Sequence, residues 1–395
     1  MLGPCAKERR PTLEDHRVAS EEQRLVAETA RAFARERLAP NAALWEKQGR
    51  IPAEVLRELG TLGFLGMTVP PEWGGAGADH VSYALALMAI AWGDGSTSTV
   101  MSVQNAPVNA LLSRFGTEAQ KRRWLVPLAR GEMIGAFALS EPQAGSDAAN
   151  LRTRAVRKGR GWVLDGSKQF ITSGSIAGPC VVFAVTDPSA GKRGISAFLV
   201  PTDRPGYKVL KIEEKIGQKA SDTCALAFES LELEEDALLG AEGEGYRIAL
   251  SALETGRVGI AAQSVGMAEA ALDHAIAYAR ERRAFGRPIL DHQAVGFRLA
   301  EAATRLEAAR QLTLHAARLL DAGEPALQAA CMAKLFASET AEAVCSAAIQ
   351  TLGGYGYLED YPVARIWRDV RVCQIYEGTS DVQKILIARG LGAQA

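Results

Sequence analysis

The chain has 395 residues, of which 48% are hydrophobic and 23% charged, a composition typical of a globular protein with a large core. Forty-five basic residues against 46 acidic ones leave a net charge of −1, so no overall field gathers nucleic acid or an anionic membrane surface. The six cysteines form no CxxC pair and the five histidines no HExxH pattern, which argues against a disulfide framework and against a metal site.

The cellular compartment is predicted from the same features. No apolar run approaches the roughly 18 residues of a membrane span, and the segment Met1 to Pro11 is followed by no hydrophobic stretch of the kind that secretory signals have. Scattered cysteines fit a reducing compartment. We therefore expect a cytoplasmic protein of bacterial type, in preference to one of the mitochondrial matrix.

Residues 1–134 are predicted to form an α-helical N-terminal domain. Ser20 with Gln23 has the pattern of a capping box, and a second box begins at Thr117. Residues 79–92 are rich in Ala, Leu and Met, so this helix is expected to be buried on most sides.

Residues 135–241 are predicted to form a central β-domain. Asp165-Gly166 is a strong hairpin signal. Because no helical pattern separates the short strands, we expect a compact antiparallel sheet or barrel. The predicted strands are Gly161–Asp165, Gln169–Thr172, Cys180–Val185, Ile195–Val200, Tyr207–Ile212 and Cys224–Leu233.

Residues 242–395 return to a helical period, in long alanine-rich segments separated by Gly and Pro. The predicted helices are Ile248–Arg282, Gln293–Asp321, Ala326–Leu352 and a shorter one after Ser380. Four such helices suffice for a C-terminal four-helix bundle. The predicted fold class is therefore α+β multidomain and mainly α.

General motif scans leave the chemistry open. No GxGxxG follows a strand and opens a helix, and no GxSxG elbow occurs. The run from Gly161 to Lys168 resembles a phosphate-binding P-loop, but Ser167 and Lys168 are transposed and a strand follows. It is interpreted as a β-turn.

Five longer motifs do carry a resemblance. They are Phe137–Asp147, Gln169–Gly174, Glu281–Gly286, Gln350–Gly356 and Gln374–Thr379. In this order and spacing they resemble the acyl-CoA dehydrogenases, flavoproteins that oxidise the Cα–Cβ bond of acyl-CoA thioesters. The resemblance covers about residues 20–390 and implies FAD as cofactor, an electron-transfer flavoprotein as partner, and a homotetramer built as a dimer of dimers. It also implies a place in fatty acid or branched-chain amino acid catabolism.

The resemblance makes Glu377 the catalytic base. An α-proton of a thioester is very weakly acidic, so its removal needs an aligned carboxylate whose pKa rises as the substrate excludes water. The family pattern further implies that the amide of Glu377 donates to the thioester oxygen and stabilises the enolate. Without the surrounding match, Glu377 is simply a solvated loop acid.

Other positions match cofactor and substrate contacts of the family. For FAD they are Phe137, Leu139, Ser140, Gly145, Ser146, Phe170, Thr172, Arg282, Phe285, Gln293, Gln350, Gly353, Gly354, Thr379 and Asp381. For the thioester they are Ser146, Glu254, Arg257 and Gly378. The resemblance implies that the positions from Arg282 to Gly354 reach the FAD of a neighbouring subunit. Two alternatives without a binding role remain open: Arg282 is an exposed charge on a helix surface, and Arg257 is a buried cation with a structural role.

Departures from the family pattern bear on the substrate. Position 256 is glycine, whereas the isovaleryl and long-chain branches carry their catalytic glutamate there, and Ser98 stands about where glutaryl-CoA dehydrogenases have an arginine. We therefore expect a short straight or short branched acyl-CoA, converted to the trans-2-enoyl-CoA. Two rivals are a flavin-dependent oxidase or monooxygenase on the same fold, and a non-enzymatic helical scaffold.

Overall fold

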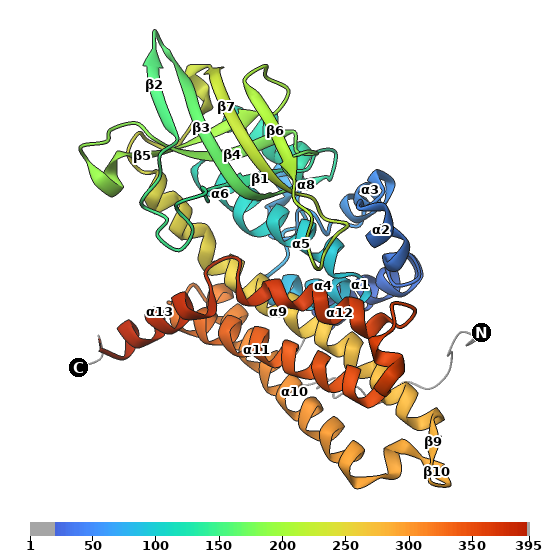
Figure 1. The fold of residues 1–395 in the computed structure, drawn as a ribbon. Helices are drawn as coiled ribbons and strands as arrows, with labels where there is room; N and C mark the ends of the chain where they lie inside the picture. The colour runs from blue at the N-terminus through green and yellow to red at the C-terminus, as the bar shows by residue number, and fades with distance from the viewer. Residues whose placement is uncertain (1–19, 393–395) are drawn as a thin grey trace.

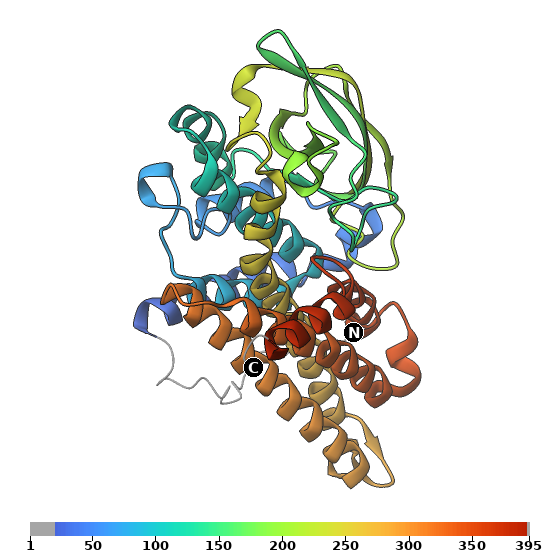
Figure 2. The same ribbon diagram turned by 90° about the vertical axis from the view of Figure 1, so that its left-hand side faces the viewer.

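The structure, a computed structural model, describes residues 20–392, and the segment Met1 to Pro11 lies outside them. A sheet, a group of N-terminal helices and a set of long C-terminal helices follow one another through the molecule (Figures 1 and 2). Helix α9 (Gly245–Glu281) runs from the sheet past the N-terminal helices and on among the C-terminal ones. The expected helix, strand, helix order is thus confirmed.

The N-terminal part is helical, as predicted, and both capping boxes are present, at Ser20 and at Thr117. Its elements are α1 Glu21–Phe33, η1 Ala34–Leu38, α2 Ala42–Gln48, α3 Ala53–Thr61, η2 Pro71–Trp73, α4 His80–Gly93, α5 Gly95–Val103, η3 Gln104–Asn109, α6 Ala110–Phe115, α7 Glu118–Gln120, η4 Lys121–Leu125 and α8 Val126–Ala129. Helix α4 is buried on most sides, as its apolar composition predicts. It packs against α9 so closely that a Cβ on Gly266 would overlap the Met88 carbonyl oxygen, so only glycine fits there.

The central sheet is mixed, which corrects the antiparallel expectation. Its strands run in the order β6-β7-β3-β2-β4-β5-β8, and β1 pairs with β4. The pairings β1–β4 and β2–β4 are parallel and the others within this sheet antiparallel. The elements are β1 Ala136–Ala138, β2 Arg154–Lys158, β3 Gly161–Thr172, β4 Pro179–Val185, η5 Gly191–Gly194, β5 Ile195–Pro201, β6 Tyr207–Ile212, β7 Thr223–Leu233, η6 Glu235–Ala237 and β8 Leu238–Leu239.

The predicted hairpin at Asp165-Gly166 is wrong, and so is the interpretation of the P-loop-like run as a turn. Strand β3 continues through both residues, with a register shift against β7 at this point. Gly166 has φ +147°, and a Cβ there would lie 2.6 Å from the Thr153 Cα. Gly166 therefore accommodates a β-bulge and the close approach of the Thr153 backbone, and it does not form a turn.

The C-terminal part contains the predicted helices and one more. Helix α10 has the predicted bounds, whereas α9 begins three residues earlier and α11 one residue later than expected. Helix α12, of nine residues between two 3-10 turns, is too short for its period to have been recognised. The elements after α9 are β9 Arg283–Ala284, β10 Arg287–Pro288, η7 Ile289–Asp291, α10 Gln293–Asp321, α11 Leu327–Leu352, η8 Gly353–Tyr357, α12 Pro362–Val370, η9 Arg371–Gln374 and α13 Ser380–Gly392.

The core crosses the expected domain boundaries. One buried apolar cluster joins α1 and α4 to α9, α10 and α11, and a second joins α6 and α8 to β4, β5 and the start of α9. The boundaries at 134/135 and 241/242 fall in the connections before β1 and before α9, and they stay predictions. No helix within residues 20–392 is both long and apolar enough to cross a membrane.

Candidate active site

Glu377 lies in the short connection between η9 and α13. It has φ +51° and is followed by Gly378 at φ +90°, so the loop carries a non-glycine residue in the left-handed region, where strain is often kept for function. The residue is half-buried, but its Oε2 is buried and has no hydrogen-bond partner among the described residues. Burial raises the pKa of Glu377 to about 7, against the opposing effect of two nearby cations, Lys334 and Arg257.

The carboxyl group of Glu377 faces the middle of α9. A Cβ built on Gly256 would overlap Oε2 and lie 2.9 Å from Cδ, so the base candidate occupies the space that any side chain at position 256 would need. One turn further, a Cβ on Gly259 would lie 2.8 Å from Tyr83 Oη and 2.9 Å from Ser102 Oγ.

Four buried polar atoms around this stretch of α9 lack hydrogen-bond partners among the described residues. They are Glu377 Oε2, Tyr83 Oη, Ser102 Oγ and Arg257 Nε. Such atoms are rare in native proteins because each costs its desolvation energy. Their concentration beside one carboxyl group makes this place the candidate binding site.

Tyr376, the residue before Glu377, is held by a buried polar network. Its hydroxyl donates to Gln263 Oε1, and Gln263 Nε2 donates to Ser98 Oγ at 2.8 Å and to Thr99 Oγ1 at 2.6 Å. Thr99 Oγ1 in turn donates to Gln218 Oε1 at 2.5 Å, from the loop between β6 and β7. The network therefore ties α5, α9 and the sheet domain to the loop that carries the carboxylate.

The first two motifs lie side by side, one running on from β1 and the other covering the end of β3. The Gln169 amide donates to the Ser140 carbonyl at 3.0 Å. Phe170 has φ +61° and its side chain is 67% exposed, so an aromatic face is presented outward beside the half-buried Thr172. Gly145 and Ser146 are exposed in the loop after β1.

Phe137 and Leu139 are placed differently from the other residues of this motif. Phe137 packs edge-on against Phe183 at 5.2 Å, and Leu139 is buried. Their side chains pack in the core, which leaves only the backbone of these two positions for the predicted cofactor contact.

A buried ion pair that sequence reasoning missed anchors the same motif. Lys168 Nζ lies 2.8 Å from Glu141 Oε1 and donates to the Leu139 carbonyl at 3.1 Å. Glu141 also accepts from the amides of Arg152 and Thr153, at 2.6 and 3.1 Å. Desolvation lowers the pKa of Lys168 to about 8, partly offset by Glu141. Both residues lie within or beside the quoted motifs, which was the available signal.

A second group of predicted cofactor residues lies far from the first. Arg282, Gly353 and Gly354 line a cavity of about 390 Å³ together with Tyr278 and Tyr355. The neighbouring predicted residues Phe285, Gln293 and Gln350 are exposed, Phe285 to 96%.

The separation of the two groups follows from α9 itself. Gly256, against Glu377, and Arg282, at the end of α9, are 26 positions apart. At 1.5 Å per helical residue this is about 39 Å. One chain therefore does not bring the group around Arg282 to the Glu377 site.

The remaining predicted residues have partners or exposure of their own. Glu254 Oε1 accepts from the Ala326 amide at 3.2 Å at the start of α11, and Arg257 is buried, at 5% exposure. Thr379 Oγ1 accepts from the Val382 amide at 3.3 Å and Asp381 is exposed, both at the start of α13.

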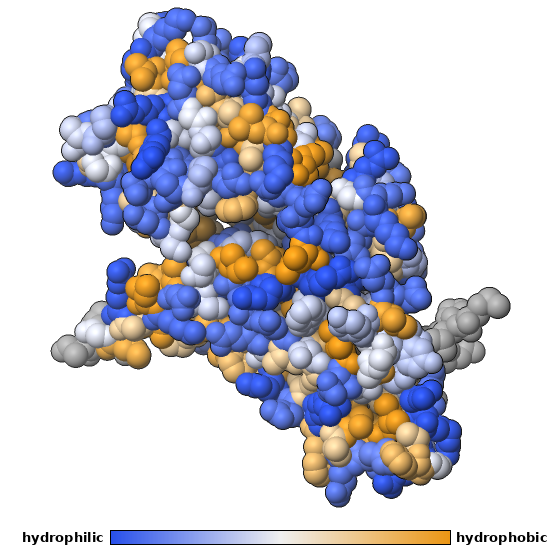
Figure 3. Space-filling view, viewed as in Figure 1, coloured by the Kyte–Doolittle hydropathy of each residue, from blue (hydrophilic) through white to orange (hydrophobic). Residues whose placement is uncertain are grey.

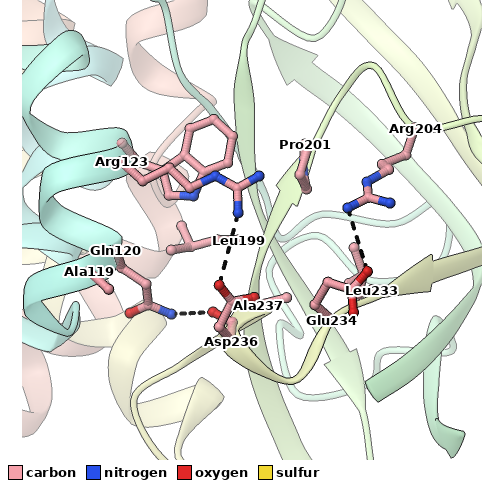
Figure 4. A pocket seen from close by; sticks show the side chains of 11 residues that line it. Ala119, Gln120, Arg123, Leu199, Pro201, Arg204, Leu233, Glu234, Asp236 and Ala237 are labelled. Carbon is pink, nitrogen blue, oxygen red and sulfur yellow. Dashed lines mark hydrogen bonds and ion pairs between the residues drawn. The ribbon is translucent and has the colours of Figure 1, made fainter. Parts of the chain in front are cut away.

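A further cavity, of about 80 Å³, lies between α7 and the end of β7 (Figure 4). Gln120 donates to the Asp236 carbonyl at 2.7 Å, and Arg123 lies 3.9 Å from the Asp236 carboxylate. These polar groups already pair with one another, so they are not free to bind a ligand. We therefore interpret the cavity as a packing gap between α7 and β7. By contrast, the face in Figure 3 is hollowed between the sheet and the C-terminal helices, with apolar side chains on both sides of the hollow.

Three domain families match the chain in succession. They are described as "Acyl-CoA dehydrogenase, N-terminal domain" over residues 20–132, "middle domain" over 136–231 and "C-terminal domain" over 243–392. Proteins with this arrangement are FAD-dependent oxidoreductases. The chain belongs to the acyl-CoA dehydrogenase family, and it is an enzyme and a flavoprotein of that class.

The similar proteins match along most of their length. The mitochondrial short-chain specific acyl-CoA dehydrogenase of Bos taurus is 46% identical over 368 residues, covering 93% of this chain and 89% of its own. The solved structure of butyryl-CoA dehydrogenase from Megasphaera elsdenii matches with a TM-score of 0.92 at 39% identity, covering 94% of this chain and 98% of that one. A chain in a structure described as the electron transferring flavoprotein of Acidaminococcus fermentans has a TM-score of 0.93 at 44% identity, with the same coverage.

Proposed function

We propose that the protein oxidises a short-chain acyl-CoA to the trans-2-enoyl-CoA, with Glu377 taking the α-proton. The observation that carries this is the Glu377 carboxyl group, whose Oε2 is buried without a partner against Gly256. An unpaired buried acid is costly unless a ligand or a reaction uses it.

The surroundings of Glu377 suit a general base. A base works best when its pKa lies near the working pH, and burial raises the pKa of Glu377 to about 7. Arg257 and Lys334 oppose this rise, so the carboxylate is ionised in part near neutral pH. A bound acyl chain that excludes water would strengthen the interactions of Glu377 with Arg257 and Lys334 further.

The residues at the end of β3 and in the loop after β1 fit FAD. The exposed ring of Phe170, the hydroxyl of Thr172 and the open backbone at Gly145 offer a stacking face and hydrogen-bonding groups without a Rossmann loop. FAD, when bound, supplies the acceptor for the hydride that leaves the β-carbon.

The second group fits the cofactor of another subunit. Arg282 carries a guanidinium, which pairs two phosphate oxygens at once, and nothing lies within 4 Å of a Cβ built on Gly353 or Gly354. Because this group lies about 39 Å along α9 from the Glu377 site, we propose a homotetramer, built as a dimer of dimers, in which these residues reach a neighbour's FAD.

The acyl chain is proposed to be short and uncharged. Ser98 is fully buried, donates to the Gly95 carbonyl at 2.7 Å and accepts from Gln263, so no cation stands there to pair with an anionic tail. The similarity to the short-chain enzyme of Bos taurus and to butyryl-CoA dehydrogenase supports the same chain length. The electron transferring flavoprotein structure supports a partner of that kind, and we place the protein in the cytoplasm.

The test is anaerobic mixing of the holoenzyme with butyryl-CoA, followed by the bleaching of the flavin absorbance. The wild type should bleach, and Glu377→Gln should retain FAD but bleach about 1000-fold more slowly, because general-base catalysis contributes on the order of 10²–10⁴-fold. Bleaching of the variant at the wild-type rate would mean another base. Peroxide formation in air would favour an oxidase, and a colourless wild-type protein would favour a scaffold.

Substrate rank and subunit contact have their own assays. A series of straight and branched acyl-CoAs with a dye acceptor should give the highest kcat/KM for short chains.

Arg282→Ala should lose FAD on dialysis. Arg280 is an exposed arginine two residues earlier on α9, and its substitution Arg280→Ala should leave FAD bound. Equal retention by both variants would contradict the proposed contact.

A further inference from the structure

We infer that Lys334, on α11, is a positioning residue for the base: it fixes the left-handed loop that carries Glu377, and its charge favours the ionised carboxylate. The inference rests on the proposed function, in which Glu377 takes the proton. Neither the sequence motifs nor the family resemblance singled out this lysine.

The loop is fixed through one carbonyl group. Lys334 Nζ donates to the Gly378 carbonyl at 2.6 Å, and Gln383 Nε2 donates to the same oxygen at 2.8 Å. Gln383 also reaches the Glu377 carbonyl at 3.4 Å. Two donors from two helices, α11 and α13, therefore hold the peptide that follows Glu377. They help to offset the cost of the left-handed backbone at Glu377.

A purely structural role leaves the charge of Lys334 unexplained. The other large buried lysine, Lys168, has the carboxylate of Glu141 at 2.8 Å. Lys334 is equally buried, at 0% exposure, but forms no ion pair within 4 Å among residues 20–392. A neutral amide could donate to a carbonyl without the desolvation cost of an ammonium. The ammonium therefore points to a longer-range partner, and Glu377 is the nearby acid.

The electrostatic surroundings of Glu377 come from several elements. Arg257 lies on α9, Lys334 on α11 and the phenol of Tyr83 on α4, and each interacts with Glu377. The thiols of Cys331 and Cys373 interact with Lys334 from α11 and η9.

Burial lowers the pKa of Lys334 to about 8, while Glu377 and the two thiols oppose that fall. The lysine is therefore mainly a cation at pH 7, around which Glu377 ionises. A positive charge close to an acid favours the carboxylate. Removing that charge should move the ionisation of Glu377 to higher pH.

The experiment compares two variants that remove a donor from the same carbonyl. Lys334→Met removes a hydrogen bond and a charge, whereas Gln383→Met removes the hydrogen bonds to the Gly378 and Glu377 carbonyls and no charge. Both are made in the full chain with FAD bound, and bleaching by butyryl-CoA is measured anaerobically over a pH series. Lys334→Gln, which retains an amide donor but no charge, is the second variant in case the methionine prevents folding.

For Lys334→Met and Lys334→Gln, the acid limb of the rate profile should move to higher pH by on the order of one unit, the effect expected of a nearby charge. In Gln383→Met the rate should fall while the limb stays in place. A limb that stays in place in both lysine variants would overturn the inference. A wild type that does not bleach would instead refute the proposed function, so the two failures are distinguishable.

Discussion

Substitution of Gly256 by alanine separates stability from catalysis. In a helix interior, alanine is more stable than glycine by about 1 kcal/mol, so an ordinary site would gain stability from the change. Here the new Cβ would overlap Glu377 Oε2 and lie 2.9 Å from Cδ, where ordinary contacts begin near 3.4 Å. The carboxyl carbon must therefore retreat by about 0.5 Å, and Oε2 by more, to restore normal packing.

The expected result is an intact holoenzyme with a slow reaction. A misplacement of about 1 Å costs roughly 100-fold in rate, so Gly256→Ala should bleach about 100-fold more slowly with butyryl-CoA. Its thermal midpoint and FAD content should stay near those of the wild type. In a Glu377→Ala background the overlap is gone, and the same substitution should then raise stability by about 1 kcal/mol. Wild-type bleaching by Gly256→Ala would refute the placement of the carboxyl group against α9.

Three further changes test the buried groups. The folded protein holds the Glu377 proton up to about pH 7, above the ordinary value of 4.5, so its ionisation destabilises the fold. Thermal unfolding should therefore show that Glu377→Gln is as stable as the wild type below about pH 4.5 and more stable by about 3 kcal/mol above pH 7. A stability gain seen only at acid pH would contradict a raised pKa for Glu377. Lys168→Met should cost about 3–5 kcal/mol and loosen FAD because it strands a buried acid, and adding Glu141→Gln should restore part of both; an unaffected single variant would rule out an anchoring role. Tyr376→Phe removes the donor to Gln263 Oε1 and should cost about 1–3 kcal/mol by denaturant unfolding, whereas an unchanged midpoint would mean that the network does not support the loop.

Local patterns predicted the helices and the strands unequally well. Long helices have a repeating apolar face, so the bounds of α10 were predicted correctly. Helix α12 is too short for an apolar repeat to be recognised in the sequence. The bulge at Gly166 was misinterpreted because Asp-Gly has the same composition in a turn and in a bulge. Only the approach of Thr153, 13 residues away in the chain, distinguishes the two.

The site divides in the same way. Motifs indicated Glu377 because the residues around it are contiguous in sequence. Lys334 and Gln263 act on that loop from other helices, and their partners depend on how α9, α11 and η9 pack. Glu141 and Lys168 lie within or beside the quoted motifs, but their pairing was not predicted because a buried ion pair has no local pattern in the sequence.

The most direct test of the account uses butyryl-CoA deuterated at the α-carbon. Single-turnover bleaching of the wild type should be several-fold slower than with the unlabelled thioester, since Glu377 must break that bond as the flavin is reduced. Glu377→Asp, whose carboxylate is shorter by one methylene, should be slower still and retain the isotope effect. Equal rates for labelled and unlabelled thioester in a wild type limited by flavin reduction would contradict proton removal by this carboxylate.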